Sequence, residues 1–353
     1  MNKVVQTWVI GAGAIAEQYH LPAIKRVSGL NVCGLVDRNP ERLQKVGDAF
    51  AIEQRMDDFR KVPLNECELV LICVPPVFQA PIAEHFLKHG KSVFIEKPGA
   101  VNAVEFQHLL KLSKSHQAPL MIGVFRRLYG VTHYLGEIVR SKRFGDLRNI
   151  RFEEGYPYAW ANESAYVFDA QVAGGGVLLD TGAHTLDRVL HVSGCERFSH
   201  LHYADNWKGG VESECSLRFI AHLREQDTPV QVEGKLSRLR ELKNAFEFEF
   251  DRATLGCGAN VPHELWIDWH VPEADSTGPE RRDQILLNQN FTDQIEEYFY
   301  QQIIKLHQIT VDNAWNETNA HSMLLNFQLF DHCYANRTPL NFAWQNIPEG
   351  LLR

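Results

Sequence analysis

The chain contains 353 residues, of which 44% are hydrophobic and 23% are charged, and its formal net charge is −8. These values exclude a disordered or fibrous chain, and the acidic balance disfavours nucleic acid or an anionic membrane as a partner. The length exceeds that of one ordinary domain of ~100–200 residues, so we expect two domains.

The sequence also predicts a cytoplasmic protein that does not enter a membrane. No apolar run approaches the ~20 residues that cross a bilayer. The apolar start at Trp8–Ile10 lacks a charged n-region and a cleavage site, and it runs directly into glycines. Seven cysteines, an odd and scattered set without a CxxC pair, favour reduced thiols over a disulfide framework or a zinc site.

Residues 4–123 alternate short apolar runs with amphipathic stretches, a pattern typical of βαβ units and a mostly parallel sheet. The expected strands are Trp8–Ile10, Leu30–Val36, Leu69–Val74, Ser92–Ile95 and Leu120–Ile122. Between the later strands, apolar residues recur at helical spacing. We therefore expect an open α/β sheet in the first third of the chain.

The first expected strand ends in a GxGxxA turn, residues 11–16, that opens a helix. Gly11 permits the tight turn, Gly13 lets backbone N–H groups approach a pyrophosphate, and Ala16 keeps the helix close to the sheet. Such turns also occur for packing reasons alone. The strand before it, the helix after it and a second strand that ends at Asp37 favour dinucleotide binding.

Asp37 and Arg38 bear on which nicotinamide nucleotide binds. A carboxylate about 20 residues after the glycines accepts hydrogen bonds from the adenosine ribose and repels a 2′-phosphate. Arg38 could instead turn toward a 2′-phosphate and pair with it. We therefore expect NAD, with NADP as the alternative.

Glu96-Lys97-Pro98 stands at the carboxyl end of a strand, where ligands of open α/β sheets bind. The proline restricts Lys97 to an extended backbone and makes a cis bond possible. The ammonium group would then face the cofactor crevice, although a solvated lysine at a strand end is the alternative.

A glycine run at residues 174–176 precedes a second group of polar residues. If the following segment is helical, Asp180, His184 and Asp187 fall at i, i+4 and i+7 and share one face. A carboxylate and an imidazole one turn apart suit general acid–base chemistry, although an Asp–His pair can also be purely structural. A metal site is disfavoured because no third His or Cys lies nearby at ligand spacing.

Taken together, GAGAIA, EKP near residue 97 and GGGxLxDxGxHxxD near residue 180 resemble the glucose–fructose oxidoreductase/inositol dehydrogenase (Gfo/Idh/MocA) family. The resemblance covers residues from about 4 to about 195. It implies an N-terminal Rossmann domain, 1–123, and a C-terminal α/β domain, 124–353, for substrate binding and oligomerisation. The second domain would have a large, mostly antiparallel open sheet and would form homodimers or homotetramers.

The resemblance further implies that Lys97, Asp180 and His184 form the catalytic set. His184 would take the proton of a substrate hydroxyl while hydride leaves the same carbon. Lys97 would stabilise the reacting oxygen, and Asp180 would bind a neighbouring hydroxyl or orient the other two groups. Val74 and Gln79 depart from the family's TPxxxH loop, so only backbone contacts to the cofactor are expected there.

The second half contributes candidate substrate contacts. Arg126 and Arg127 stand where the family's domains join and could reach the cofactor or an anionic substrate, or form a solvated charge pair. Tyr156 and Trp160 belong to an aromatic stretch that could stack on a sugar ring or fill an interdomain core.

The remaining elements are expected in chain order as follows. A helix at 132–140 precedes a strand at 147–155, and residues 211–223 and 230–271 alternate as strands, most clearly at Phe246, Phe248 and Phe250. The strongly apolar face of that sheet would pack against another subunit. The segment 273–282 is expected as an exposed loop, and helices are expected at 291–303 and 315–334.

The sequence thus predicts an NAD(P)-dependent oxidoreductase that acts on a secondary alcohol or ketone of a sugar, cyclitol or sugar derivative. Two alternatives are a redox-neutral glycosidase or isomerase that retains its cofactor and a non-catalytic NAD(P)-binding regulator. The residues assigned to the cofactor are Gly11, Gly13, Ala14, Ile15, Asp37, Arg38, Val74, Pro75, Glu96 and Lys97. Those assigned to the substrate are Arg126, Arg127, Tyr156, Trp160, Asp180 and His184.

Overall fold

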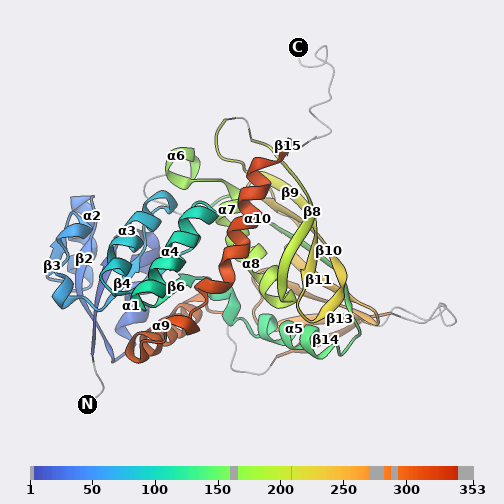
Figure 1. Cartoon of the computed structure of the whole chain (residues 1–353), viewed down its shortest axis with the longest axis horizontal. Coiled ribbons are helices and arrows are strands. Elements are labelled where there is room, and N and C mark those ends of the chain that lie inside the picture. The colour runs from blue at the N-terminus through green and yellow to red at the C-terminus, as the bar shows by residue number, and fades with distance from the viewer. Residues whose placement is uncertain (1–3, 160–165, 208, 271–281, 288–292, 341–353) are drawn as a thin grey trace, which may run out of the picture.

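The computed structural model describes residues 4–159, 166–207, 209–270, 282–287 and 293–340. These residues form two sheets with helices packed between and around them (Figure 1). No helix in the described ranges is both long enough and apolar enough to cross a membrane.

The first sheet has six parallel strands in the order β3-β2-β1-β4-β5-β6. Its strands are β1 (Val5–Ile10), β2 (Leu30–Val36), β3 (Gln54–Met56), β4 (Leu69–Ile72), β5 (Ser92–Glu96) and β6 (Leu120–Gly123). Its helices are α1 (Leu21–Lys25), α2 (Pro40–Ala49), α3 (Pro76–Lys88) and α4 (Ala103–His116). The strand order reverses between β1 and β4, the point where doubly wound sheets bind ligands, so the predicted Rossmann architecture is confirmed.

The second sheet has nine strands in the order β14-β13-β12-β11-β7-β10-β9-β8-β15. Its strands are β7 (Leu147–Gly155), β8 (Cys195–Asp205), β9 (Glu214–Leu223), β10 (Gln226–Ser237), β11 (Ala245–Phe250), β12 (Ala253–Gly258), β13 (Glu264–Trp269), β14 (Arg282–Leu286) and β15 (Arg337–Pro339). The β7–β10 and β8–β15 pairs are parallel and the other pairs are antiparallel. The expected mostly antiparallel sheet is therefore confirmed.

The apolar face of this sheet is covered within the chain. Phe246, Phe248 and Phe250 alternate along β11 and are all fully buried. Arg188 of α8 (Gly182–Ser193) stacks over the Phe246 ring at 4.7 Å, so helices of the same chain lie on this face. The opposite face carries ion pairs between strands, such as Lys235–Glu153 at 3.0 Å. The expectation that the apolar face meets another subunit is thus corrected.

The last helices of the chain return to the Rossmann sheet. Phe299 of α9 (Ile295–Asp312) stacks on Tyr19 with ring centroids 4.7 Å apart. Phe327 of α10 (Leu324–Ala335) stacks on Phe106 of α4 at 4.3 Å, and Figure 1 shows α10 running between the two sheets. The domain boundary near residue 124 stays a prediction, because residues beyond it complete the cover of the first sheet.

The expected final helix at 315–334 is broken. Two short 3-10 segments precede α10, and the backbone is extended at Thr318 between them. The Asn319 side chain bonds both the N–H (2.9 Å) and the C=O (2.7 Å) of Ile122 at the end of β6. These hydrogen bonds to a strand distant in the sequence hold the chain between the two 3-10 segments. Helical spacing in the sequence cannot predict such a contact.

Candidate active site

A cavity of about 710 Å³ lies between the carboxyl ends of the Rossmann strands and residues of the later chain, from Phe125 to Phe299. The glycine turn, Lys97, Asp180 and His184 all line it. The structure thus brings the three predicted catalytic residues, which come from different parts of the chain, to one cavity.

The glycine turn leaves room for a ligand. Gly11 has a φ of +102°, and a Cβ there would lie 2.4 Å from the carbonyl oxygen of Cys73, so only glycine fits. At Gly13 no atom lies within 4 Å of the position of a Cβ. Ala14 and Ile15 follow it along the cavity wall. Open space beside backbone N–H groups at a helix start is what a pyrophosphate needs.

Asp37 is held at the end of β2 by two backbone bonds. Its Oδ2 accepts from Ala12 N at 2.7 Å and its Oδ1 accepts from Asn39 N at 2.8 Å, and the residue lines the cavity. Arg38 is not among the lining residues, and its guanidinium lies 5.5 Å from the centroid of the Phe78 ring. The carboxylate, rather than the arginine, therefore faces the cavity.

Gln79 ties together the two loops that carry Val74 and Lys97. Its Nε2 donates to Val74 O (3.1 Å) and Lys97 O (3.4 Å), and its Oε1 accepts from Gly99 N (2.9 Å). The Lys97–Pro98 peptide is cis. The amide that stands in place of the family's histidine thus fixes the lysine loop, and Val74 and Pro75 line the cavity.

Glu96 lines the cavity, but its carboxylate has partners within the protein. It accepts from Lys97 N at 3.1 Å and pairs with the fully buried His20 at 2.6 Å. The Glu96 side chain, which was predicted to contact the cofactor, therefore holds the backbone of Lys97 through this hydrogen bond.

The segment that carries Asp180 is two short helices rather than one. Helix α7 (Val177–Asp180) ends before Thr181, and α8 begins at Gly182. The buried Glu212 carboxylate accepts from Gly176 N and Leu178 N at 3.0 Å and from the Tyr334 hydroxyl at 2.9 Å. A Cβ on Gly176 would lie 1.9 Å from Glu212 O, so the glycine run is required for this close approach.

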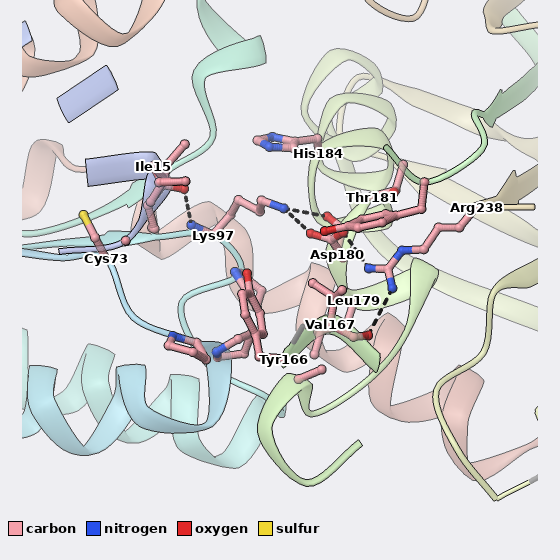
Figure 2. A pocket seen from close by; sticks show the side chains of 18 of the residues that line it. Ile15, Cys73, Lys97, Tyr166, Val167, Leu179, Asp180, Thr181, His184 and Arg238 are labelled. Carbon is pink, nitrogen blue, oxygen red and sulfur yellow. Dashed lines mark hydrogen bonds and ion pairs between the residues drawn. The ribbon is translucent and has the colours of Figure 1, made fainter. Parts of the chain in front are cut away.

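Asp180 forms ion pairs with cations on both sides (Figure 2). The Lys97 ammonium bonds its Oδ1, and Arg238 Nη2 bonds its Oδ2 at 2.5 Å. Burial alone would raise the pKa of this carboxyl group, but the charges and hydrogen bonds of Lys97 and Arg238 lower it below the ordinary value. The group is therefore an anion that holds the lysine in place.

His184 is buried against the Phe125 ring, with centroids 5.0 Å apart, and lines the cavity. Its Nδ1 has no hydrogen-bond partner among the described residues. Burial, together with the positive charges of Arg126 and Lys97, lowers the pKa of this imidazole well below its ordinary value. The ring is therefore neutral near pH 7 and able to accept a proton.

Asp187 and Arg127 do not meet the other predicted site residues. Asp187 bonds the Arg127 guanidinium at 2.8 and 2.5 Å, and neither residue lines the cavity. Arg126 does line it, but both its Nη atoms bond the buried Glu154 carboxylate at 2.8 Å. Asp180 and His184 thus share the cavity as expected, and the expectation is corrected for Asp187 alone, whose carboxylate bonds Arg127 outside the cavity lining.

Further residues complete the site. Tyr156 lines the cavity, whereas Trp160 lies outside the described residues. Arg238 and Tyr166 were not predicted, and both line the cavity. Burial and the nearby Asp180 carboxylate raise the pKa of Tyr166, so its hydroxyl keeps its proton and can donate it in a hydrogen bond. Within the described ranges, no cluster of three or more His, Cys, Asp or Glu residues could hold a metal ion.

The fold and the cavity combine a Rossmann sheet, a glycine turn with room for a ligand and a second, mostly antiparallel sheet. Residues 5–124 match a family model described as an oxidoreductase family with an NAD-binding Rossmann fold, and residues 132–217 match the GFO/IDH/MocA C-terminal domain. The chain belongs to the Gfo/Idh/MocA family, and its first domain is an NAD-binding Rossmann domain.

Relatives with assigned names are about a quarter identical to the chain over the stretch that aligns. Inositol 2-dehydrogenase of Rhizobium meliloti (strain 1021) is 25% identical over 195 residues, which cover 55% of this chain and 57% of the relative. UDP-N-acetylglucosamine 3-dehydrogenase of Acidithiobacillus ferrooxidans is 28% identical over 194 residues, covering 54% and 55%. The chain therefore spans little more than half the length of these relatives.

Solved structures share the fold over nearly the whole chain. Levoglucosan dehydrogenase in complex with NADH has a TM-score of 0.79 at 14% identity, covering 95% of this chain and 97% of that one. A 3-ketoreductase from Actinomadura kijaniata with NADP and TDP-benzene has a TM-score of 0.78 at 17% identity, covering 96% and 100%. These similarities establish the fold alone.

Proposed function

We propose that the protein is an NAD(P)-dependent oxidoreductase that acts on a secondary alcohol or ketone of a sugar, cyclitol or sugar derivative. The observation that carries this proposal is the meeting of the Lys97 ammonium, the Asp180 carboxylate and the neutral His184 imidazole at a cavity that also contains the glycine turn. A regulator that only binds nucleotide has no chemical need for these three groups.

Each of the three residues has a distinct task in this proposal. Neutral His184 accepts the proton of the substrate hydroxyl in the oxidative direction. Lys97 donates a hydrogen bond to the reacting oxygen and stabilises its developing negative charge. Asp180, fixed by Arg238, orients the lysine and can accept a hydrogen bond from a neighbouring hydroxyl. The bound nicotinamide supplies the hydride acceptor or donor.

An activity panel tests the proposal. The purified protein is assayed with NAD and NADP against sugars, inositols, nucleotide sugars and aryl glycosides while nicotinamide absorbance and products are followed. Net cofactor reduction supports the dehydrogenase, and His184→Ala should slow turnover ~10²–10⁴-fold while cofactor affinity stays unchanged. Product without net reduction would identify a redox-neutral enzyme, and nucleotide binding without turnover would identify a regulator.

We propose NAD as the preferred cofactor, because the fixed Asp37 carboxylate faces the cavity. Asp37→Ala should raise the ratio of kcat/KM with NADP to kcat/KM with NAD by about tenfold, since the repulsion of a 2′-phosphate is removed. Asp48→Ala removes a carboxylate that pairs with Arg55 away from the cavity and should leave the ratio unchanged. An Asp37→Ala ratio equal to that of the unmodified protein would refute the assignment.

We also propose a cytoplasmic location and a homo-oligomer. All seven cysteines are unpaired, as expected in a reducing compartment. A second copy would meet the exposed face of the nine-stranded sheet through charged side chains such as Arg151 and Glu249, because the apolar face is covered.

A further inference from the structure

The substrate end of the cavity has a wall made of tyrosines, here called the aromatic wall and formed by Tyr156 and Tyr158. Both residues line the cavity, and 43% of the Tyr156 surface is exposed to solvent. Phe168, which is 57% exposed, packs edge-on against Tyr158 with ring centroids 5.5 Å apart and extends the wall outward. Aromatic rings exposed beside a cavity offer apolar surface that a ligand can cover.

The aromatic wall is built on rigid backbone. Tyr156 N bonds Ser237 O at 3.2 Å and Tyr158 N bonds Arg238 O at 2.9 Å, so the segment that follows β7 is held beside the end of β10. The two rings are therefore preorganised before any ligand arrives, which reduces the entropy lost on binding.

The wall also joins the catalytic group. The Arg238 guanidinium that bonds Asp180 lies 5.4 Å from the centroid of the Tyr158 ring. Asn260 Nδ2 lies 3.4 Å from the Tyr156 hydroxyl and also lines the cavity. A ligand whose reacting ring lies beside Asp180 and whose remainder extends toward Tyr156 would contact an apolar ring face with polar groups at its edge. This pattern suits a sugar ring.

The charges of the cavity argue against a phosphorylated ligand. Its described lining contains four cationic side chains and four carboxylates: Arg42, Lys97, Arg126 and Arg238, and Asp37, Glu96, Glu154 and Asp180. Each of the four cations bonds a carboxylate, either in the cavity or, for Arg42, on Glu17. Away from the glycine turn, the cations of the described lining thus already have carboxylate partners, which disfavours a second diphosphate beside the reacting sugar.

We propose that the substrate is an uncharged glycoside with at least two rings, whose reacting ring lies against Lys97, Asp180 and His184 and whose second ring stacks on the aromatic wall. This inference rests on the proposed function for the position of the reacting ring. It selects neutral glycosides over both free monosaccharides and nucleotide sugars.

Calorimetric binding to the protein loaded with NADH tests the proposal. Glucose is compared with cellobiose and maltose, galactose with lactose, and all of them with UDP-glucose and UDP-N-acetylglucosamine. We expect at least one two-ring sugar to bind tenfold or more tightly than its single-ring partner, and the nucleotide sugars to bind no more tightly than glucose. Tighter binding of a nucleotide sugar, or no two-ring preference in any pair, overturns the proposal.

Variants of the wall locate the effect. Tyr156→Ala should reduce the two-ring preference to near onefold, whereas Tyr156→Phe, which keeps the ring, should retain most of it. Trp207→Ala removes an exposed aromatic ring outside the cavity lining and should change nothing. A two-ring preference that survives Tyr156→Ala overturns the assignment of the wall.

The two proposals fail separately in this design. Two-ring binding without any oxidation or reduction of the nicotinamide would overturn the proposed function and keep the aromatic wall. Turnover of nucleotide sugars or single-ring sugars, without a two-ring preference, would keep the oxidoreductase and overturn the wall.

Discussion

Arg238 is the second cation, after Lys97, that keeps the Asp180 carboxyl group ionised. Together with Lys97 it keeps this carboxyl group ionised despite burial. Arg238→Met should therefore raise the pKa of Asp180 and lower kcat/KM about 10- to 100-fold, because a hydrogen bond to a charged group contributes about 1.5–3 kcal/mol. Arg238→Lys should restore part of the activity, since the charge returns without the planar fork.

The pH profile of kcat/KM separates this role from general loss of structure. In Arg238→Met protonation of Asp180 should add a second loss of activity to the acidic limb that His184 sets, because the pKa of Asp180 rises when one of its two cations is removed. Arg240→Met is the matched control, since Arg240 pairs with Glu214 and does not line the cavity. If Arg240→Met lowers kcat/KM as much as Arg238→Met, the role assigned to Arg238 is wrong.

The lowered pKa of His184 sets the pH below which kcat/KM for alcohol oxidation should fall. Its pKa in the folded protein lies below the unperturbed value of about 6.5, so the imidazole is neutral and basic above that value. The kcat/KM for alcohol oxidation should stay constant from pH 8 down to pH 6.5 and fall only at lower pH. An acidic limb above pH 6.5 that disappears in His184→Gln would contradict the assigned protonation state.

The same lowered pKa affects stability. The unfolded chain binds a proton at His184 below about pH 6.5, whereas the folded chain does not. The contribution of neutral, buried His184 to the free energy of unfolding is therefore present above pH 6.5. It is lost as the pH falls from 6.5 toward the pKa of His184 in the folded protein. Part of the acid sensitivity of unfolding should disappear in His184→Gln.

At the scale of residues, the sequence predicted groups that lie in recognisable motifs and missed groups that arrive from distant strands. Lys97, Asp180 and His184 each belong to a motif with fixed spacing. Arg238 bonds Asp180 across 58 positions of the chain, and no local pattern distinguishes it from its neighbour Arg240. Arg127 was predicted at the substrate from its position where the family's domains join, but its guanidinium pairs with Asp187 instead.

At the scale of elements, Glu212 holds α7 through hydrogen bonds from three donors. Glu212→Ala should lower the free energy of unfolding by about 3 kcal/mol or more, since buried N–H and O–H groups lose their acceptor. Glu212→Gln should cost less, because one amide oxygen can still accept from Gly176, Leu178 and Tyr334. Urea denaturation measures both values, and equal losses would show that charge rather than hydrogen bonding matters.

Elements with a clear period were predicted, and elements without one were not. β7 matches its predicted range, and β11 alternates as expected. β8 has little regular alternation between buried and exposed positions, because it lies near one edge of the sheet, so its sequence lacks the signal of a half-buried strand. β3 is only three residues long and gives no measurable period.

At the scale of the whole molecule, the two sheets share their helical cover. α9 packs on the Rossmann helix α1, and α10 contacts both α4 and β8. Neither sheet therefore retains all of its apolar cover if the other part unfolds. The packing at Phe106 and Phe327 is one such shared contact, and its loss in Phe327→Ala should cost about 3–5 kcal/mol.

This interlocking predicts one unfolding transition rather than two. In scanning calorimetry, heating should give a single peak, and NADH at a hundred times its Kd should add about 2.7 kcal/mol to the free energy of unfolding of the entire chain. The cofactor contacts the first sheet, but α9 and α10 couple its stabilisation to the second. Two separate peaks, of which NADH moves only one, would mean that the helices returning to the Rossmann sheet contribute too little to make the two parts cooperative.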